Sequence, residues 1–311
     1  MANLFRIEKK RIVKLTRKEE ENILKISPLF QSVSKSVYFD NYDLPCPILV
    51  EVKTKYGELK KMVLRKTRQG NVKKEVQIIK LLEEFGLPVP KILHLPFKNE
   101  NGEYVAIYSL LPGENLQKLS MGSKKELNEA KRLLILAVTK LMNTTQFIRR
   151  SKLSRVLPTI TLDSELKNLN TKENPWFKEE RFQSAIKKLK IATKNINTPL
   201  VFSNGDYQPG NFLAKNGKIS GFLDFESPSF QDPLMGFVKY PIYDLIPLSR
   251  INLIKLFLKR NNFSRKDFNI RLAIGCLKTL KKEIPVNGGN KEVQKYRKRV
   301  LNLLDKSLEI I

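Results

Sequence analysis

The residues that could do chemistry gather between positions 201 and 237, in VFSNGDYQPGNFLAKNGKISGFLDFESPSFQDPLMGF. Asp206 is followed five residues later by Asn211, and Asp224 stands thirteen residues beyond Asn211. Two short apolar runs joined by an Asn-Gly turn separate Asn211 from Asp224, which is the pattern of a β-hairpin. Such a hairpin can bring the oxygen atoms of these side chains around one point. The arrangement suits a proton acceptor beside a magnesium-bound nucleotide.

Phosphoryl transfer asks for little covalent chemistry from a protein. It needs metal ions that bridge the phosphates, a cation on the phosphates, and an acceptor for the proton of the attacking hydroxyl. Asp206 can take the proton, and Asn211 and Asp224 can hold magnesium through hard oxygen ligands. A cation on a strand near residue 65 can reach the phosphates, and Glu75 on the helix that follows can orient it. Taken alone, Asp206 and Asn211 would be interpreted as turn residues and Asp224 as a cap of the hairpin, so the prediction depends on the whole set.

Composition excludes several classes of protein. The 311 residues allow one large domain or two modest ones. His94 is the only histidine, which nearly excludes both histidine-based metal sites and a Ser-His-Asp triad, and Cys46 and Cys276 lack metal-site spacing. We interpret the cysteines as thiols in a reducing compartment. No apolar run approaches the roughly 20 residues of a membrane helix, and the N-terminus lacks a signal-peptide pattern, so we expect a cytoplasmic protein without a membrane span.

The net charge of +27, from 58 Lys and Arg against 31 Asp and Glu, can mark a surface that binds nucleic acid. The basic residues are spread over the whole chain and are mostly Lys, while Ile and Asn are also plentiful. A genome rich in A and T would give this usage without a functional meaning. The charge therefore indicates a general attraction for anionic ligands such as nucleotides, and nucleic acid is a possible but not a favoured partner.

The residues up to Gly113 have the pattern of a small α+β unit. Thr16 and Glu19 stand at capping-box spacing before a short helix. Runs rich in β-formers between 32 and 67 predict three antiparallel strands, a helix is predicted over 71–85, and two further strands follow it. On the third strand, alternation places Arg65 on the face of Val63 and Lys66 on the opposite face.

Beyond Gly113 the pattern is mainly helical, with residues 151–178 irregular. The predicted helices cover Leu127–Ile148, 179–195, 243–260, 265–283 and 291–309. We therefore predict an α+β fold of two lobes with the nucleotide between them. Residues 1–113 form a β-rich, nucleotide-binding lobe, and residues 114–311 form a mainly helical lobe that holds the catalytic residues and the acceptor.

At this point the sequence resembles a family, the aminoglycoside phosphotransferase-like kinases, which include choline- and fructosamine-type kinases. The resemblance rests on Gly205-Asp206-x4-Asn211 with Gln-Pro-Gly before the Asn, on Phe222-Leu-Asp-Phe-Glu226, and on Asp232-Pro. Upstream it extends to Val-Leu-Arg65, Glu75, Pro-Val-Pro and Leu-Pro-Gly113, so that it covers roughly residues 50–240. An Asp-x4-Asn pattern alone would be weak, whereas the ordered set at the family's spacing is specific.

The resemblance implies a bilobal protein-kinase-like fold that binds ATP or GTP with Mg²⁺. Asp206 would be the catalytic base, Asn211 and Asp224 the magnesium ligands, and a strand cation paired with Glu75 would hold the phosphates. Arg65 takes the usual lysine place with Lys66 next to it, and the shared face with Val63 favours Arg65. The purine would lie at the hinge, which the family's pattern places at Tyr108, Ser109, Leu110 and Leu111.

Three positions depart from the family's pattern. Asn204 stands where the family usually has His, a residue that braces the catalytic loop, so we expect activity to survive the change. Gly236 stands near a further family Asp, and its absence predicts looser support of that loop. No glycine-rich phosphate loop is visible near 38–48, where NYDLPCP is found instead.

We predict a magnesium-dependent kinase that moves the γ-phosphate of ATP or GTP to a hydroxyl of a small molecule, with Asp206 as the base. The acceptor would be selected by the helical lobe and residues 151–178. The basic C-terminal half disfavours a polycationic antibiotic, and a sugar, an amino alcohol or an anionic metabolite stays open. The alternative is a catalytically inactive kinase-like protein that binds nucleotide or nucleic acid through its basic surface. The sequence does not indicate an oligomeric state.

Overall fold

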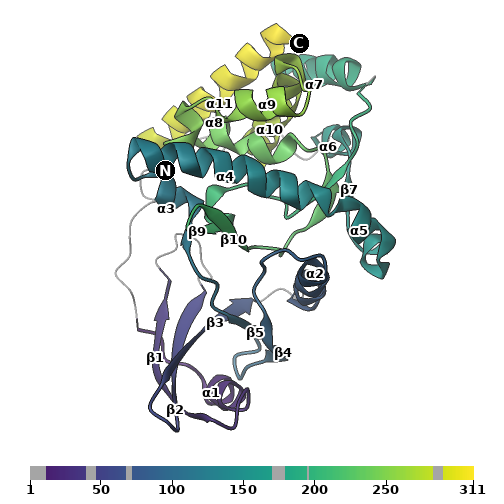
Figure 1. Ribbon diagram of the computed structural model, residues 1–311. Helices are drawn as coiled ribbons and strands as arrows, with labels where there is room; N and C mark the ends of the chain where they lie inside the picture. The colour runs from purple at the N-terminus through teal and green to yellow at the C-terminus, as the bar shows by residue number, and fades with distance from the viewer. Residues whose placement is uncertain (1–11, 40–46, 68–71, 170–178, 195, 283–289) are drawn as a thin grey trace. The chain divides into compact units, whose positions relative to one another are not determined.

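The computed structural model describes residues 12–39, 47–67, 72–169, 179–194, 196–282 and 290–311 (Figure 1). The chain forms two compact units. The first unit contains Met1–Gly113 and Ile219–Glu226, and the second contains Glu114–Lys218 and Ser227–Ile311. The roles predicted for residues 1–113 and 114–311 stay predictions.

The first unit is built on an antiparallel sheet with the strand order β1-β2-β3-β5-β4. The strands are β1 Phe30–Tyr38, β2 Ile48–Thr54, β3 Leu59–Thr67, β4 Ile92–Lys98 and β5 Tyr104–Ser109. Alternate apolar residues of β2, β3 and β5 point to one side, where Met62 and Leu64 join a fully buried core with Ile23. The predicted antiparallel strands agree with this sheet.

Two helices accompany this sheet, and both begin where the sequence predicts. Helix α1, Arg17–Leu24, starts with a complete capping box between Thr16 and Glu19, and it buries Ile23 in the core beside Met62 and Leu64. Helix α2, Val72–Glu84, buries a row of apolar residues and Glu75. After helix α2 the chain turns at Gly86, which has a φ of +90°, a value that glycine adopts readily.

The segment Ile219–Glu226 belongs to the first unit although it is distant in sequence. It contains most of strand β10, Lys218–Phe222, and the residues that follow the strand. Phe222 donates its backbone N–H to the carbonyl oxygen of Pro88 at 2.9 Å, and the Ser220 hydroxyl donates to that of Pro112 at 2.6 Å. These bonds attach the segment that carries Asp224 to the end of the β-rich unit.

The second unit is mainly helical, as predicted, and it also contains short β-strands. Its longer helices are α4 Lys124–Asn143, α6 Leu162–Leu169, α7 Glu180–Thr193, α9 Leu253–Arg260, α10 Arg265–Lys282 and α11 Lys291–Ile310. Helix α4 starts with the capping box of Ser123 and Glu126, and α10 and α11 pack side by side (Figure 1). Strands β7 Thr159–Ile160, β11 Ser229–Gln231 and β8 Val201–Ser203 form one sheet in that order.

Three predicted segments of the second unit differ from the structure. The helix predicted over Leu127–Ile148 is interrupted at Thr144, which separates α4 from α5, Thr145–Arg150. The segment predicted as irregular contains β7 and α6, and its residues 170–178 lie outside the described residues. The helix predicted over 243–260 is broken because Pro247 has no N–H and restricts the residue before it. Helix α8, Lys239–Tyr243, ends before this proline and α9 begins after it.

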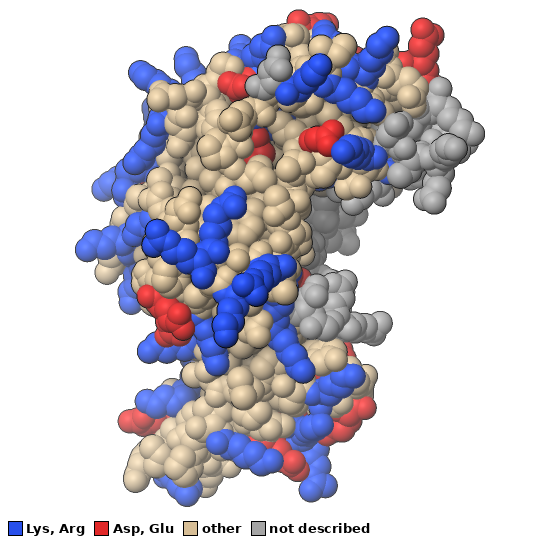
Figure 2. Space-filling view, turned by 90° about the vertical axis from the view of Figure 1, so that its right-hand side faces the viewer, with Lys and Arg blue, Asp and Glu red and all other residues tan. Residues whose placement is uncertain are grey.

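Basic side chains are distributed over the visible face instead of forming one block (Figure 2). This distribution matches the spread of Lys and Arg along the sequence. Among the helices that the structure describes, none is both long and apolar enough to cross a membrane.

Candidate functional site

Asp206 lies in a loop that is shaped by the residues on either side of it. Strand β8 ends at Ser203, and a short 3₁₀ turn, Pro209–Asn211, closes the loop before strand β9, Phe212–Lys215. Gly205 has a φ of +89°, and a Cβ atom there would lie 2.7 Å from the carbonyl oxygen of Ser227. Any larger residue at this position would be strained and would clash, so the Gly-Asp pair of the motif has a physical reason.

Hydrogen bonds within this loop fix the Asp206 side chain and backbone. The Asp206 N–H donates to Oδ1 of Asn204 at 3.3 Å, and Oδ1 of Asp206 accepts from the backbone N–H of Gln208 at 3.1 Å. The Asn211 side-chain amide donates to the Asp206 carbonyl oxygen at 3.2 Å. The structure thus brings Asp206 and Asn211 together, and buried Asn204 braces the loop where the family usually has His. The expectation that this substitution leaves activity intact stays a prediction.

Two residues that were not predicted support the Asp206 loop. The Lys239 ammonium lies 2.6 Å from Oδ2 of Asp206. The Tyr240 hydroxyl donates to the carbonyl oxygen of Tyr207 at 2.7 Å. No local signal in the sequence marks these residues, because each lies thirty-three positions from its partner.

A charged cluster around Arg65 is a second group of candidate residues, and it lies entirely within the first unit. Arg65 Nη1 lies 2.6 Å from Oε1 of Glu75, and Nη2 lies 3.2 Å from Oδ1 of Asp224 and 2.6 Å from Oε1 of Glu226. We call these four residues the Arg65 cluster. The ion pair implied between the strand cation and Glu75 is present, and Asp224 contacts the same guanidinium. Glu226 ends the Phe222–Glu226 motif, but the sequence does not predict it as a site residue.

Burial and charge act against each other in the Arg65 cluster. Burial lowers the pKa of Arg65, but the attraction of Glu75, Glu226 and Asp224 outweighs this effect and raises it overall. Burial raises the pKa of Glu75, and the neighbouring carboxylates of Glu226 and Asp224 raise it further. Arg65 lowers it, but the net result is a pKa of about 7. A hydrogen bond from the Phe225 backbone to Glu75 also lowers it. Glu75 thereby contacts both Arg65 and Phe225, the residue that directly follows Asp224.

Asp224 has a left-handed backbone conformation, with a φ of +62°. This conformation is uncommon for residues other than glycine, although Asp and Asn adopt it more readily than most. Strained residues of this kind gather at functional sites and persist where the surroundings fix them. Here the contact with Arg65 and the Glu75–Phe225 bond fix the segment.

Lys66 points away from the Arg65 cluster. Its Nζ atom lies 2.8 Å from Oε1 of Glu19, a fully buried carboxylate of α1, and 3.9 Å from Glu103. Asn99 donates to the same Glu19 oxygen at 2.7 Å. Because neighbouring residues of a strand face opposite sides, Lys66 faces the α1 side and Arg65 faces Glu75 of α2. This is the alternation that the sequence predicts for the two cations.

The four residues predicted at the purine hinge lie at the end of β5 and just after it. Tyr108 is buried, and its hydroxyl has no hydrogen-bond partner among the described residues. Burial raises its pKa, and Glu75 adds to this effect, which places the phenol near the Arg65 cluster. The Ser109 hydroxyl accepts the backbone N–H of Lys91 at 2.9 Å. Leu110 is 39% exposed and Leu111 is half-buried, so both present apolar surface to solvent.

The carboxylates of the Arg65 cluster have the chemistry of magnesium ligands. Carboxylate oxygens of Asp224 and Glu226 meet at one nitrogen of Arg65. Hard oxygen atoms of this kind are the ligands that Mg²⁺ prefers. No group of three or more His, Cys, Asp or Glu side chains with metal-binding geometry occurs among the described residues. A magnesium ion would therefore take phosphate or water oxygens as well, which is usual for nucleotide sites.

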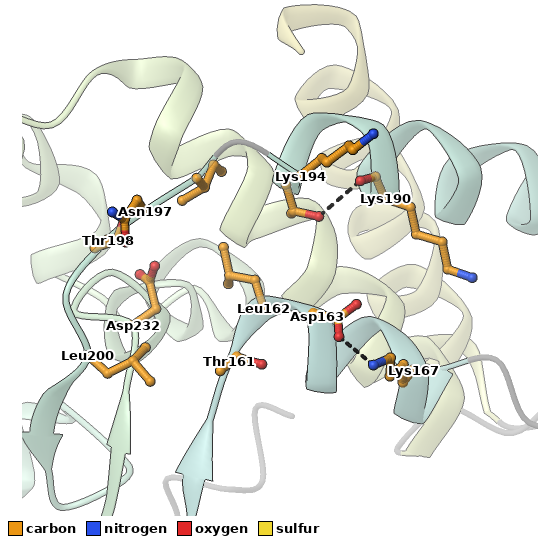
Figure 3. Close-up of a pocket in the computed structure, with 12 residues that line it drawn as sticks. Thr161, Leu162, Asp163, Lys167, Lys190, Lys194, Asn197, Thr198, Leu200 and Asp232 are labelled. Atoms are coloured by element: carbon orange, nitrogen blue, oxygen red, sulfur yellow. Dashed lines mark hydrogen bonds and ion pairs between the residues drawn. The ribbon is translucent and has the colours of Figure 1, made fainter.

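The second unit also contains a pocket of about 690 Å³ beside α6 and α7 (Figure 3). Thr161, Asp163, Lys190, Thr198 and Asp232 are among its lining residues. The Asp163 carboxylate is paired with Lys167, and buried Asp232 is bound by Arg271 from the neighbouring helix α10. None of the residues predicted for the site lines this pocket.

The model of the phosphotransferase enzyme family matches residues 50–244, which is more than half of the chain. The chain belongs to the phosphotransferase enzyme family. The match confirms the resemblance inferred from the motifs and the prediction of an enzyme of the kinase class. A search of curated proteins found no match to the chain.

Solved structures of phosphotransferases share the fold at low sequence identity. A thermostable mutant of aminoglycoside phosphotransferase APH(4)-Ia, in a ternary complex with ADP and hygromycin B, has a TM-score of 0.63 and 14% identity, covering 94% of this chain and 98% of its own. Choline kinase LicA from Streptococcus pneumoniae has a TM-score of 0.57 and 14% identity, covering 94% and 100%. An aminoglycoside phosphotransferase with GDP and kanamycin has a TM-score of 0.59 and 15% identity, covering 92% and 97%. These similarities confirm the predicted α+β, protein-kinase-like fold.

Proposed function

We propose that this phosphotransferase moves the γ-phosphate of ATP or GTP to a hydroxyl group of a small molecule, with the help of Mg²⁺. The family match supports the reaction class. Similar structures that contain ADP, AMP-PNP or GDP support a nucleoside triphosphate as the donor. The observation that carries the proposal is the Arg65 cluster, in which a strand cation holds both Glu75 and Asp224.

Asp206 is the proposed base. Its carboxylate is held on one oxygen by the Gln208 N–H and on the other by Lys239, so its orientation is fixed before an acceptor arrives. In the proposed reaction Asp206 takes the proton of the acceptor hydroxyl, the acceptor oxygen bonds to the γ-phosphorus, and the nucleoside diphosphate leaves. Asp206 would also orient the hydroxyl, which contributes by proximity.

Asn211, Asp224 and Glu226 are the proposed residues that hold magnesium. When bound, the ion would neutralise charge on the phosphates and orient them. Arg65 is the proposed phosphate cation, because a guanidinium donates to phosphate oxygens in a fixed planar geometry. Glu75 would keep Arg65 in place, and Tyr108, Ser109, Leu110 and Leu111 would line the purine end. We propose Arg65 over Lys66 for the phosphates because the ammonium of Lys66 is committed to buried Glu19.

The acceptor is proposed to be a small hydroxyl compound without several positive charges. Similar structures contain hygromycin B or kanamycin, and one is a choline kinase, so hydroxyl acceptors of different charge occur among proteins with this fold. The net charge of +27 disfavours a polycationic acceptor through repulsion. Neutral sugars, amino alcohols and hydroxy acids are the classes to screen for nucleotide consumption.

The proposal is tested by comparing the full chain with Asp206→Asn and Asp224→Asn. We expect Mg-ATP or Mg-GTP to raise the melting temperature of the native chain and to be consumed with release of the nucleoside diphosphate. Asp206→Asn should keep nucleotide binding and lower turnover by roughly 100-fold or more. Asp224→Asn should raise the magnesium concentration needed for half-maximal binding.

Asp305→Asn is the matched control, because Asp305 is a half-exposed carboxylate of α11 paired with Arg181 on the surface. It should behave like the native chain in both assays. A native chain that neither binds nor consumes ATP or GTP would overturn the proposal. Retention on heparin that weakens with salt, without nucleotide binding, would then favour the alternative of an inactive, nucleic-acid-binding protein.

A further inference from the structure

Lys239 places an ammonium group directly on the carboxylate of Asp206. Its Nζ atom lies 2.6 Å from Oδ2, while Oδ1 accepts the backbone N–H of Gln208. Donors of the second unit therefore engage both oxygen atoms of the proposed base. The side chains of Lys239 and Asp206 are 33% and 19% exposed, so their interaction is screened less than that of a pair in open solvent.

A second contact, one residue further along both segments, lies beside the Lys239–Asp206 pair. The Tyr240 hydroxyl donates to the carbonyl oxygen of Tyr207, and both tyrosines are fully buried. Because Tyr207 follows Asp206 and Tyr240 follows Lys239, the two contacts join the same two segments. Because the rings of both tyrosines are buried, the packing of α8, more than this single hydroxyl bond, places the ammonium group beside Asp206.

An ammonium group at this place has a chemical consequence. It carries three N–H donors and no acceptor, and the bond to Asp206 uses one of the donors. The others can serve oxygen atoms that come close to the carboxylate. A fixed positive charge in a partly buried site also stabilises negative charge that develops on neighbouring oxygen atoms during a reaction.

We propose that Lys239 is a positioning residue of the phosphoryl transfer, an inference that rests on the proposed role of Asp206 as the base. Lys239 holds Oδ2 so that the remaining lone pairs of the carboxylate point to the acceptor hydroxyl. The proton passes from that hydroxyl to Asp206, the oxygen–phosphorus bond forms, and the bond to the nucleoside diphosphate breaks. Lys239 itself keeps its proton throughout.

The competing explanation is that Lys239 only ties α8 to the Asp206 loop. A structural tie would affect folding, whereas a positioning role affects turnover in protein that is fully folded. Tyr240→Phe is the matched control, because it removes the adjacent hydrogen bond to Tyr207 and leaves the ammonium group in place. The comparison therefore separates the effect of joining the two segments from the effect of the charge.

The test measures the release of inorganic phosphate from Mg-ATP and Mg-GTP by the full chain, with water as the acceptor. The native chain is compared with the variants Lys239→Met, Lys239→Arg, Tyr240→Phe and Asp206→Asn. We expect Lys239→Met to lower kcat by about 30- to 100-fold with a KM for nucleotide within about threefold. Lys239→Arg should recover about tenfold of the loss because it keeps the positive charge. Tyr240→Phe should lower the melting temperature and keep kcat within about threefold. A nucleotide-induced thermal shift checks that each variant is folded.

Three results would overturn the role of Lys239. One is a Lys239→Met protein with native kcat, another is a Lys239→Arg protein no more active than Lys239→Met, and the third is an equal loss of kcat in Tyr240→Phe. Failure of the proposed function looks different. In that case the native chain and Asp206→Asn release phosphate at the same rate, or the native chain neither binds nor consumes nucleotide, and the role of Lys239 falls with that of Asp206.

Discussion

The ring of Tyr207 occupies the space that a side chain on residue 236 would need. A Cβ atom built on Gly236 would lie 2.2 Å from Cδ2 of Tyr207, far closer than van der Waals contact. The Tyr207 ring also packs against Phe237, with ring centroids 5.3 Å apart. The sequence predicted that Gly236, in place of a family Asp, loosens the support of the Asp206 loop. That expectation stays a prediction. The structure gives Gly236 a packing role, because its missing side chain leaves room for the Tyr207 ring next to Asp206.

Gly236→Ala should therefore destabilise the protein by about 2–4 kcal/mol, because Tyr207 is fully buried and its ring cannot easily move aside. Urea unfolding measures the change. Gly210→Ala is the control, since a Cβ atom there meets nothing within 4 Å. In the double variant with Tyr207→Ala, the cost of Gly236→Ala should largely disappear. A full cost in that background would contradict the steric explanation.

Arg271 and Asp232 form a fully buried ion pair that should dominate the stability of the second unit. Arg271 Nη2 lies 2.6 Å from Oδ2 of Asp232 and donates to Thr198 at 2.8 Å. Arg271→Leu would leave the Asp232 carboxylate buried without its cation, and we expect a loss of about 3–5 kcal/mol in urea unfolding.

Lys167→Leu provides the comparison for Arg271. Lys167 pairs with Asp163 at 2.7 Å, but their side chains are 73% and 66% exposed. Exposed pairs of this kind contribute little, so the change should stay within about 0.5 kcal/mol. Equal losses in the two variants would show that burial of the Arg271 pair does not have the predicted effect.

The stability of the protein should depend on pH through Glu75. The folded protein raises the pKa of Glu75 to about 7 from an ordinary value of 4.5, chiefly through burial. The folded state therefore holds this proton more tightly than the unfolded chain. The contribution of Glu75 to stability is complete below about pH 4.5 and is lost as the pH rises through about 7.

Glu75→Gln should remove this part of the pH dependence. Melting temperatures at about pH 5 and about pH 8 should differ by roughly 5 °C less in the variant than in the native chain. Glu84→Gln, which changes an exposed carboxylate of the same helix, should keep the native difference. An unchanged pH dependence in Glu75→Gln would show that the proton is not bound there.

Arg65 and Lys66 should have separable roles although they are neighbours. Arg65→Met should weaken nucleotide binding by about tenfold or more, measured by calorimetry, because it removes the proposed phosphate cation. Lys66→Met should keep the affinity within about threefold and lower the melting temperature, because Glu19 would lose the cation beside its buried carboxylate. The reverse pattern would make Lys66 the phosphate ligand.

Much of the fold follows from patterns that are local in sequence. The capping boxes at Thr16 and Ser123 predict where α1 and α4 begin, because the bonds involved span three residues. The turn after β9 has positive φ at both Asn216 and Gly217, as an Asn-Gly hairpin turn requires. The prediction of a helix over 243–260 was wrong, because it followed the apolar periodicity and gave too little weight to Pro247, which breaks the segment.

The candidate site shows the same division between local and distant information. Strand alternation places Arg65 and Lys66 on opposite faces, but only the packing of α1 and α2 gives each cation its acid. Gly205, Asp206 and Asn211 stand out because their bonds close within one short loop.

By itself, the sequence determined the family, the α+β fold and the residues that could take part in chemistry. Helix caps, turns and the Asp-x4-Asn motif act over a few residues and can therefore be recognised in the sequence. The tertiary structure alone decided which groups act on them. Lys239 reaches Asp206, and Gly236 admits the ring of Tyr207, across about thirty residues of chain. Such contacts depend on how whole elements pack, and no local pattern of residue types encodes that packing.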